Sequence, residues 1–193
     1  MARKRVAAAH PTTVQAWIER AAADPEAVSA FAVIRARLAA GAQLAALRRL
    51  RIIEVRGALP AADEVRALLH RSSQFYNPHS ERCHVRVADG DAAPIEPGEH
   101  ALLVTERGDE RRPGAERWWR HETGAAVEVR EGVAWLIRFD LAGAKARAAV
   151  ESLAVLRDRK TGLLCNPHAQ DVAFADGAIP MPWIGAANAG GAG

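Results

Sequence analysis

The sequence NPHAQDVAFADG at residues 166–177 repeats the beginning and the end of the sequence NPHSERCHVRVADG at residues 77–90. Both stretches open with Asn-Pro-His, close with Ala-Asp-Gly and follow a segment patterned as a strand and then a helix. Asn before Pro is disfavoured in the helical conformation and its side chain can cap a turn, so each stretch should end a helix and start a strand. Similarity at this scale indicates a duplicated half-fold; the alternative is a chance likeness between two turns.

Upstream of the first stretch, the pattern predicts two helices, a strand and a third helix. Asp24 followed by Pro25 is typical of a helix start, since it offers an acidic N-cap and a proline at the first helical position. The predicted segments are a helix that Thr12 or Thr13 caps and that contains Val14, Trp17, Ile18 and Ala21, a helix from Asp24 to Gly41, a strand over 50–56, a helix over 61–70 and, after the turn, a strand over 83–87.

Downstream of the first stretch, Gly, Pro and Asp are frequent at residues 89–98 and predict a linker. The segments predicted beyond it are strands over 101–105, 126–130, 133–139 and 171–174, and helices over 113–122 and 143–156. The pair Glu131-Gly132 should form a hairpin between the second and third of these strands. The order β-α-β-β-α-β indicates a ferredoxin-like sheet with two helices on one face.

The whole chain is therefore expected to be an α+β protein, with a ferredoxin-like sheet, an additional strand-helix-strand unit and N-terminal helices. We expect four parts, namely an N-terminal helical segment (1–48), a strand-helix-strand half unit with its linker (49–97), the ferredoxin-like unit (98–184) and a disordered tail rich in Gly and Ala (185–193).

The composition is that of a globular protein. Of 193 residues, 49% are hydrophobic and 25% are charged, and no apolar run approaches the roughly 20 residues of a membrane span. The basic N-terminus is not followed by the apolar core of a secretion signal, so we expect a cytoplasmic protein with free thiols.

The positive charge is concentrated near the N-terminus. Residues 1–51 carry nine Arg or Lys against three acidic residues, although the net charge of the chain is only +3. Such a segment can bind nucleic acid, with Arg48, Arg49 and Arg51 as candidates, but it has few aromatic residues on which bases would stack. The alternative is a solvated basic face.

Histidine and cysteine recur in both Asn-Pro-His stretches and offer borderline and soft metal ligands. If the two stretches meet, a zinc site is one hypothesis, although the local spacing matches neither a finger nor a ribbon. A Cys/His nucleophile pair, Cys165 with His168 or His79, is another, but no oxyanion site is evident. The candidate metal ligands are Cys83, His84, Cys165 and His168.

Trp118 and Trp119 are adjacent, so at most one of them can face the core of the protein. The other is either an anchor of an interface or a lid over the core. Together with the turns, they complete the candidate binding or interface residues, which are Asn77, His79, Asn166, His168, Arg130, Trp118 and Trp119.

Residues 100–176 resemble PurS, the small subunit of phosphoribosylformylglycinamidine synthase, and the equivalent N-terminal domain of the large single-chain enzyme. The stretches that carry the resemblance are LLVT at 102–105, the short helix about 115–124, VEVREGVAWLI at 127–137 and LLCNP at 163–167, which looks like the Leu-Leu-x-Asn-Pro that ends the last helix of PurS. His168 departs from the pattern, since the family usually has an aliphatic residue there. Residues 50–90 look like another half of the same unit, so one chain could combine part of what PurS achieves as an oligomer.

The resemblance implies a non-catalytic subunit without a cofactor. Its partners would be a synthetase subunit and a glutaminase subunit, whose assembly lets ammonia from glutamine reach formylglycinamide ribonucleotide in an ATP-dependent amidation. Asn166, Pro167 and the run Arg130-Glu131-Gly132 would be structural or interface positions. Two alternatives remain open: a ferredoxin-like module that binds a ligand or nucleic acid through its basic N-terminal segment, and an enzyme or metal site at the His/Cys cluster.

Overall fold

The computed structural model describes residues 12–158, 160–175 and 177–185. The elements, in chain order, are β1 (Thr13–Arg20), α1 (Pro25–Arg37), the 3-10 turn η1 (Gly41–Gln43), β2 (Leu44–Gly57), α2 (Ala62–Arg71), β3 (Glu81–Arg86), β4 (Glu99–Glu106), α3 (Pro113–Thr123), β5 (Val127–Phe139), α4 (Gly143–Ala154) and β6 (Gln170–Ala175). The protein is thus of the α+β class, as predicted.

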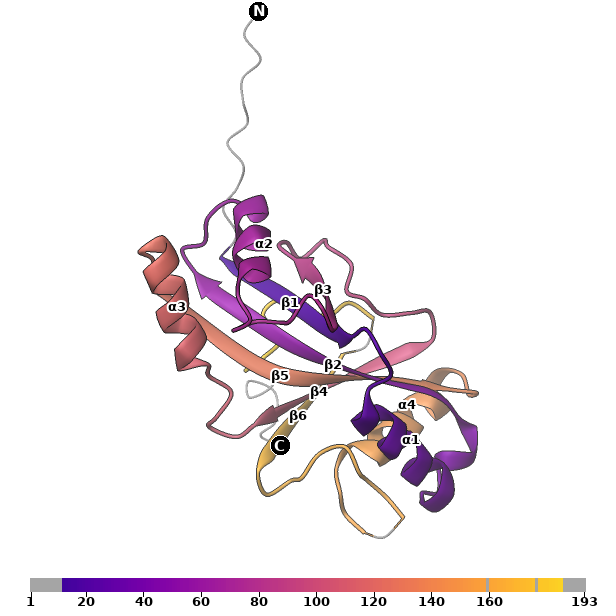
Figure 1. The fold of residues 1–193 in the computed structure, drawn as a ribbon. Helices are drawn as coiled ribbons and strands as arrows, with labels where there is room; N and C mark the ends of the chain where they lie inside the picture. Colours follow the sequence, from indigo (N-terminus) through magenta and orange to yellow (C-terminus); the bar gives the residue numbers. More distant parts are fainter. Residues whose placement is uncertain (1–11, 159, 176, 186–193) are drawn as a thin grey trace, which may run out of the picture.

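All six strands form one antiparallel sheet in the order β3-β1-β2-β5-β4-β6 (Figure 1). The two long strands β2 and β5 pair along almost their whole length and form the centre of the sheet. β3 and β6 lie at its two edges.

Apart from the 3-10 turn η1 of the first half, the two halves of the chain have the same order of elements and occupy equivalent positions on the two sides of the centre of the sheet. β1-α1-β2-α2-β3 is followed by β4-α3-β5-α4-β6, and the strand order reads symmetrically outward from β2 and β5. An offset of 86 residues carries Thr13–Arg20 onto Glu99–Glu106, and an offset of 89 residues carries Glu81–Arg86 onto Gln170–Ala175. The second offset also carries one Asn-Pro-His turn onto the other.

The helices cover one face of the sheet in two pairs, and each pair takes one helix from each half of the chain. Figure 1 shows α2 and α3 at one end of the sheet and α1 and α4 at the other. The core under the first pair includes Val65 and Leu69 of α2 and Trp119 of α3, and the core under the second includes Ile34 of α1 and Leu153 of α4. Neither half therefore completes a helical layer alone.

Two loops cover the opposite face of the sheet. The segment after β6 packs Ile179, Trp183 and Ile184 on the strands, and the segment after β3 adds Ala93 and Ile95. Both loops follow an edge strand. No helix of the described residues lies on this face, but its central part is still buried.

The helix predicted between Thr12 or Thr13 and Ala21 is wrong, because these residues form the strand β1. Val14, Ala16 and Ile18 face the core under α2 and α3, while Trp17 faces the opposite core. A strand buried on both faces lacks polar alternation, so its apolar residues imitate helical spacing. The second predicted helix is confirmed: Asp24 caps α1 and accepts hydrogen bonds from the N–H groups of residues 26 and 27.

The hairpin predicted at Glu131-Gly132 is also wrong, because β5 runs without a break from Val127 to Phe139. Gly132 lies inside the strand, where an added Cβ would come within 2.9 Å of Leu103 and 3.0 Å of Thr105. Glycine is present because β4 approaches closely, not because the chain turns.

The predicted linker at residues 89–98 joins β3 to β4, and the strands on both sides of it belong to one sheet. Of the tail predicted to be disordered, residues 186–193 lie outside the described residues, as do the first eleven residues of the chain. Within the described part, no helix is both long enough and apolar enough to cross a membrane.

Candidate functional site

The two Asn-Pro-His turns have the same hydrogen-bond pattern. The side-chain oxygen of Asn77 accepts from the backbone N–H two residues later (3.1 Å), and Asn166 does the same (3.0 Å). The side chain that begins the next strand accepts from the asparagine N–H, Glu81 at 2.7 Å and Gln170 at 2.9 Å. Both asparagines therefore stabilise the turn that starts the next strand, as expected. The prediction that each of them also ends a helix is wrong, because α2 ends at Arg71 and α4 at Ala154, before these turns.

The turns do not converge. His79 precedes β3 and His168 precedes β6, which are the two outermost strands, and both histidines are exposed. Cys83 and Cys165 are separated in the same way and are free thiols. No group of three or more potential metal ligands occurs among the described residues, so the structure does not bring the predicted ligands together.

The two cysteines are in environments that suppress their reactivity. Burial raises the pKa of Cys83 to about 12, although Arg51 acts in the opposite direction. Burial, and then the nearby Asp171, also raise the pKa of Cys165. Because the thiolate is the nucleophile, neither residue is prepared for covalent chemistry at neutral pH.

Of the two tryptophans of α3, only one faces the core, as predicted. Trp119 is fully buried in the core under α2 and α3, whereas Trp118 is half-buried at its margin. Phe75 meets the ring of Trp118 edge to face at 5.5 Å and that of Trp119 at 6.0 Å. Trp118 therefore closes the core over Phe75 and keeps only part of its surface available to a partner.

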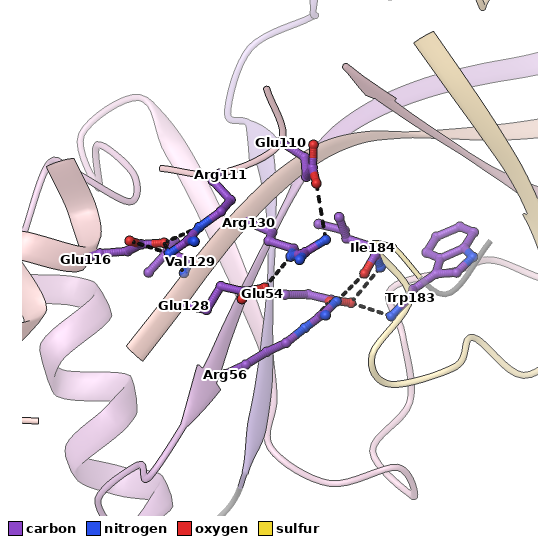
Figure 2. Close-up of polar contacts among 10 residues, drawn as sticks. All are labelled: Glu54, Arg56, Glu110, Arg111, Glu116, Glu128, Val129, Arg130, Trp183 and Ile184. Carbon is purple, nitrogen blue, oxygen red and sulfur yellow. Dashed lines mark hydrogen bonds and ion pairs between the residues drawn. The ribbon is translucent and has the colours of Figure 1, made fainter. Parts of the chain in front are cut away.

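Arg130 belongs to a charged cluster on the face of the sheet opposite the helices (Figure 2). Its guanidinium donates to Glu110 at 3.2 Å and to the carboxylate of Glu128. The hydrogen bond from Arg130 lowers the pKa of Glu128. The charge of Arg130 is thus engaged within the chain.

Next to this cluster, the buried carboxylate of Glu54 binds the backbone of the C-terminal segment. One of its oxygens accepts from the N–H groups of Trp183 (2.5 Å) and Ile184 (3.2 Å), and Arg56 pairs with its other oxygen and donates to the carbonyl of Ile184 (Figure 2). The side chain of Glu54 has no exposed surface. A buried carboxylate is tolerated here because each oxygen has donors and an arginine is adjacent.

Gln15 links Glu54 to a buried arginine, Arg86. Its amide nitrogen donates to Glu54 (2.8 Å) and to the carbonyl of Pro180 (2.9 Å), and its amide oxygen accepts from Arg86 (2.5 Å). Arg86 also donates to the carbonyls of Asp91 (2.8 Å) and Ile179 (3.2 Å), and burial lowers its pKa. The cluster therefore holds both loops that cover this face.

The cluster of Gln15, Glu54 and Arg86 occurs in only one half of the chain. At the offsets that relate the strands, Ala101 and Ala175 occupy the positions of Gln15 and Arg86. Its partners are backbone groups of the chain itself, so its role is structural. The pattern of the sequence did not predict this cluster; its signal is a single carboxylate, Glu54, flanked by Ile52, Ile53 and Val55.

The arginines proposed for nucleic-acid binding are paired with carboxylates. Their partners are Glu19 and Glu99 for Arg48, Asp24 and Glu26 for Arg49, and Glu81 and Glu131 for Arg51, at 2.9 to 3.4 Å. This part of the surface therefore presents alternating charges instead of the unpaired basic stripe that phosphate groups need.

A cavity of about 410 Å³ lies between α1, the end of β1 and the first part of β2. Its wall is largely apolar and includes Ala27, Val28, Phe31 and Leu47, and the charged pairs of Arg48 and Arg49 stand at its rim. An apolar centre with a polar rim is the arrangement found at protein interfaces.

Comparison with known proteins gives no family for this chain. No family model matches it, and no curated protein is detectably similar to it.

Proposed function

We propose that this protein is a non-catalytic assembly subunit of the PurS type, which joins a synthetase subunit to a glutaminase subunit in the ATP- and glutamine-dependent amidation of formylglycinamide ribonucleotide. The observation that carries the proposal is that the stretch similar to PurS has the same bounds as one complete structural half of the chain. The stretch that resembles PurS, residues 100–176, coincides with the complete second half, β4 to β6.

The first half supports the same proposal. In the first half, the sequence resemblance covers only residues 50–90. Together with β1 and α1, however, this stretch forms a unit with the same five elements as the second half. A chain of two such units would combine two copies of a small subunit that elsewhere associate as separate chains. Duplication of one ancestral unit accounts for the matching turns at Asn77 and Asn166.

A second part of the proposal concerns the fold of each half. We infer that each half is a variant of the ferredoxin-like unit in which the two middle strands have merged into one. Residues 127–132 of β5 pair with β2 and, on the other side, only with the short segment before α3 through an isolated bridge between Arg111 and Arg130, whereas residues 133–138 pair with β4 there. The predicted break at Glu131-Gly132 falls where this change of neighbours occurs.

The chemistry of the described residues is consistent with a scaffold. The buried carboxylate of Glu54 binds backbone N–H groups, and burial raises the pKa of both cysteines. The proposal therefore assigns no catalytic group to this chain and places the reaction on its partners.

Reconstitution with purified synthetase and glutaminase subunits tests the proposal. We expect glutamine-dependent amidation to require this chain, and ammonia-dependent amidation to proceed without it, because free ammonia bypasses transfer between the subunits. Glutamine-dependent activity that is unaffected by the chain, together with growth of a deletion strain without added purines, would contradict the proposal.

A further inference from the structure

The outer surface of α1 differs from that of the other helices. The residues from Ala27 to Ile34 carry no charge, although Ser29, Ala32 and Val33 are exposed. Val28 is 57% exposed and Val33 is 43% exposed. A helix that is apolar all round is normally buried on both sides, so this surface lacks a partner in the isolated chain.

The opposite end of the sheet provides an internal comparison. There the paired helices α2 and α3 are strongly amphipathic in sequence and expose charged side chains, among them Glu64, Arg66, Arg117 and Arg120. All the exposed large hydrophobic side chains of the described residues instead belong to α1, to the loop after α4 and to β6. That loop reaches the end of α1, where Ala39 donates to the carbonyl of Lys160.

The charges on α1 indicate which partner fits. Glu26 lies in its first turn and pairs with Arg49 of the same chain at 2.9 Å, but 67% of its side chain stays exposed. Arg37 lies in the last turn, exposed and without an ion pair among the described residues. At 100° per residue the two side chains project from nearly the same flank of the helix. If two copies of α1 pack antiparallel, each Glu26 approaches the Arg37 of the other copy.

We propose that the protein forms a homodimer through α1, in which the helices of the two copies pack antiparallel about a twofold axis. Such an interface is isologous, so one surface has to be complementary to itself, and the opposite charges at the two ends of α1 meet this requirement. Ala32 and Ala36 allow the helices to approach closely. The cavity beside Val28 and Phe31 gives room for an apolar side chain of the second copy.

Sedimentation analysis of the intact chain from micromolar to millimolar concentration tests this proposal. We expect the mass of two chains for the native protein and the mass of one chain for Ala32→Arg, because a large charged group at the centre of the surface prevents close approach. The matched control is Arg117→Glu on α3, which should leave the dimer unchanged. A native protein that stays monomeric over the whole range would overturn the proposal.

A charge exchange tests the antiparallel arrangement itself. Glu26→Arg and Arg37→Glu should each weaken the dimer at least about tenfold, and the double variant should restore it, provided that circular dichroism shows an intact fold. Self-association that survives Ala32→Arg, or a double variant weaker than both single variants, would show that another surface is used.

Discussion

Among single residues, Glu54 connects two distant parts of the chain. Its carboxylate accepts hydrogen bonds from Trp183 and Ile184, which are 129 and 130 residues further along the sequence. The carboxylate gives these two buried N–H groups an acceptor, which the segment lacks because it forms no helix or strand. Arg56 and Gln15 complete its partners. A buried ion pair of this kind adds little net stability to the protein, but removing one of its two partners is strongly destabilising.

Replacing Glu54 should therefore strongly destabilise the protein. We expect Glu54→Ala to lower the free energy of unfolding by about 3–5 kcal/mol, because buried donors and Arg56 lose their acceptor. Glu54→Gln keeps one acceptor oxygen and should cost less. Urea unfolding measures the loss, and Glu151→Ala, which removes an exposed ion pair with Arg147 on α4, is the matched control. Equal losses in the two alanine variants would contradict this account.

Among the helices and strands, β5 shows how a glycine makes room for the side chains of the neighbouring strand. Gly132 lies within the continuous strand, and the absence of a side chain there leaves room for Leu103 and Thr105 of β4. In the loop after β3, by contrast, a side chain holds the backbone: Asp91 accepts from the N–H groups of Val87 (2.7 Å) and Ala88 (3.1 Å).

The variant Gly132→Ala should destabilise the sheet. The added methyl group would come within 3.1 Å of three atoms of β4, one of which is a backbone oxygen, and overpacking of this kind costs about 1–3 kcal/mol. The matched control is Gly90→Ala, whose added Cβ would meet nothing within 4 Å. Thermal unfolding of both variants checks this, and a loss as large in Gly90→Ala would show that the close approach is not the cause.

The stability that the loop after β3 adds to the protein should depend on pH, because Asp91 holds this loop. Hydrogen bonds from Val87, and to a smaller extent from Ala88, lower the pKa of its carboxyl group. A lowered folded-state pKa contributes stability above the unfolded value, near 3.9, and this contribution is lost as pH falls through the folded value. The difference in melting temperature between the native protein and Asp91→Asn should thus be constant from pH 7 to about pH 5 and shrink below about pH 4. A difference that does not vary with pH would contradict this assignment.

At the scale of the whole molecule, the two halves of the chain are interleaved. Each helical layer takes one helix from each half, and β2 and β5 pair across the boundary along almost their whole length. The halves are therefore repeats in sequence order but not independent domains.

Separating the halves between β3 and β4 should abolish folding of either half as a monomer. Residues 1–92 alone would leave α2 without α3, and β2 without β5. We expect each half to be unfolded or self-associated, and the two halves to reassemble into a cooperatively folded complex when they are expressed together. Circular dichroism and gel filtration distinguish these outcomes, and a monomeric half that unfolds cooperatively would refute the interleaved arrangement.

The features that depend on neighbouring residues could be predicted from the amino-acid sequence. Asp24 and Pro25 start α1, Asn77 and Asn166 form the turns before the edge strands, and most helices and strands lie where the pattern predicts them. These features rest on backbone preferences and on contacts within a few residues, which the order of residue types encodes directly.

The features that depend on residues far apart in the sequence could be identified only in the folded protein. The strand β1 and the unbroken β5 follow from burial on both faces and from the close approach of β4, and the separation of His79 from His168 follows from the strand order. The partners of Glu54 come from the other end of the chain. Such features arise from pairing and packing between remote segments, for which a single sequence carries no local signal.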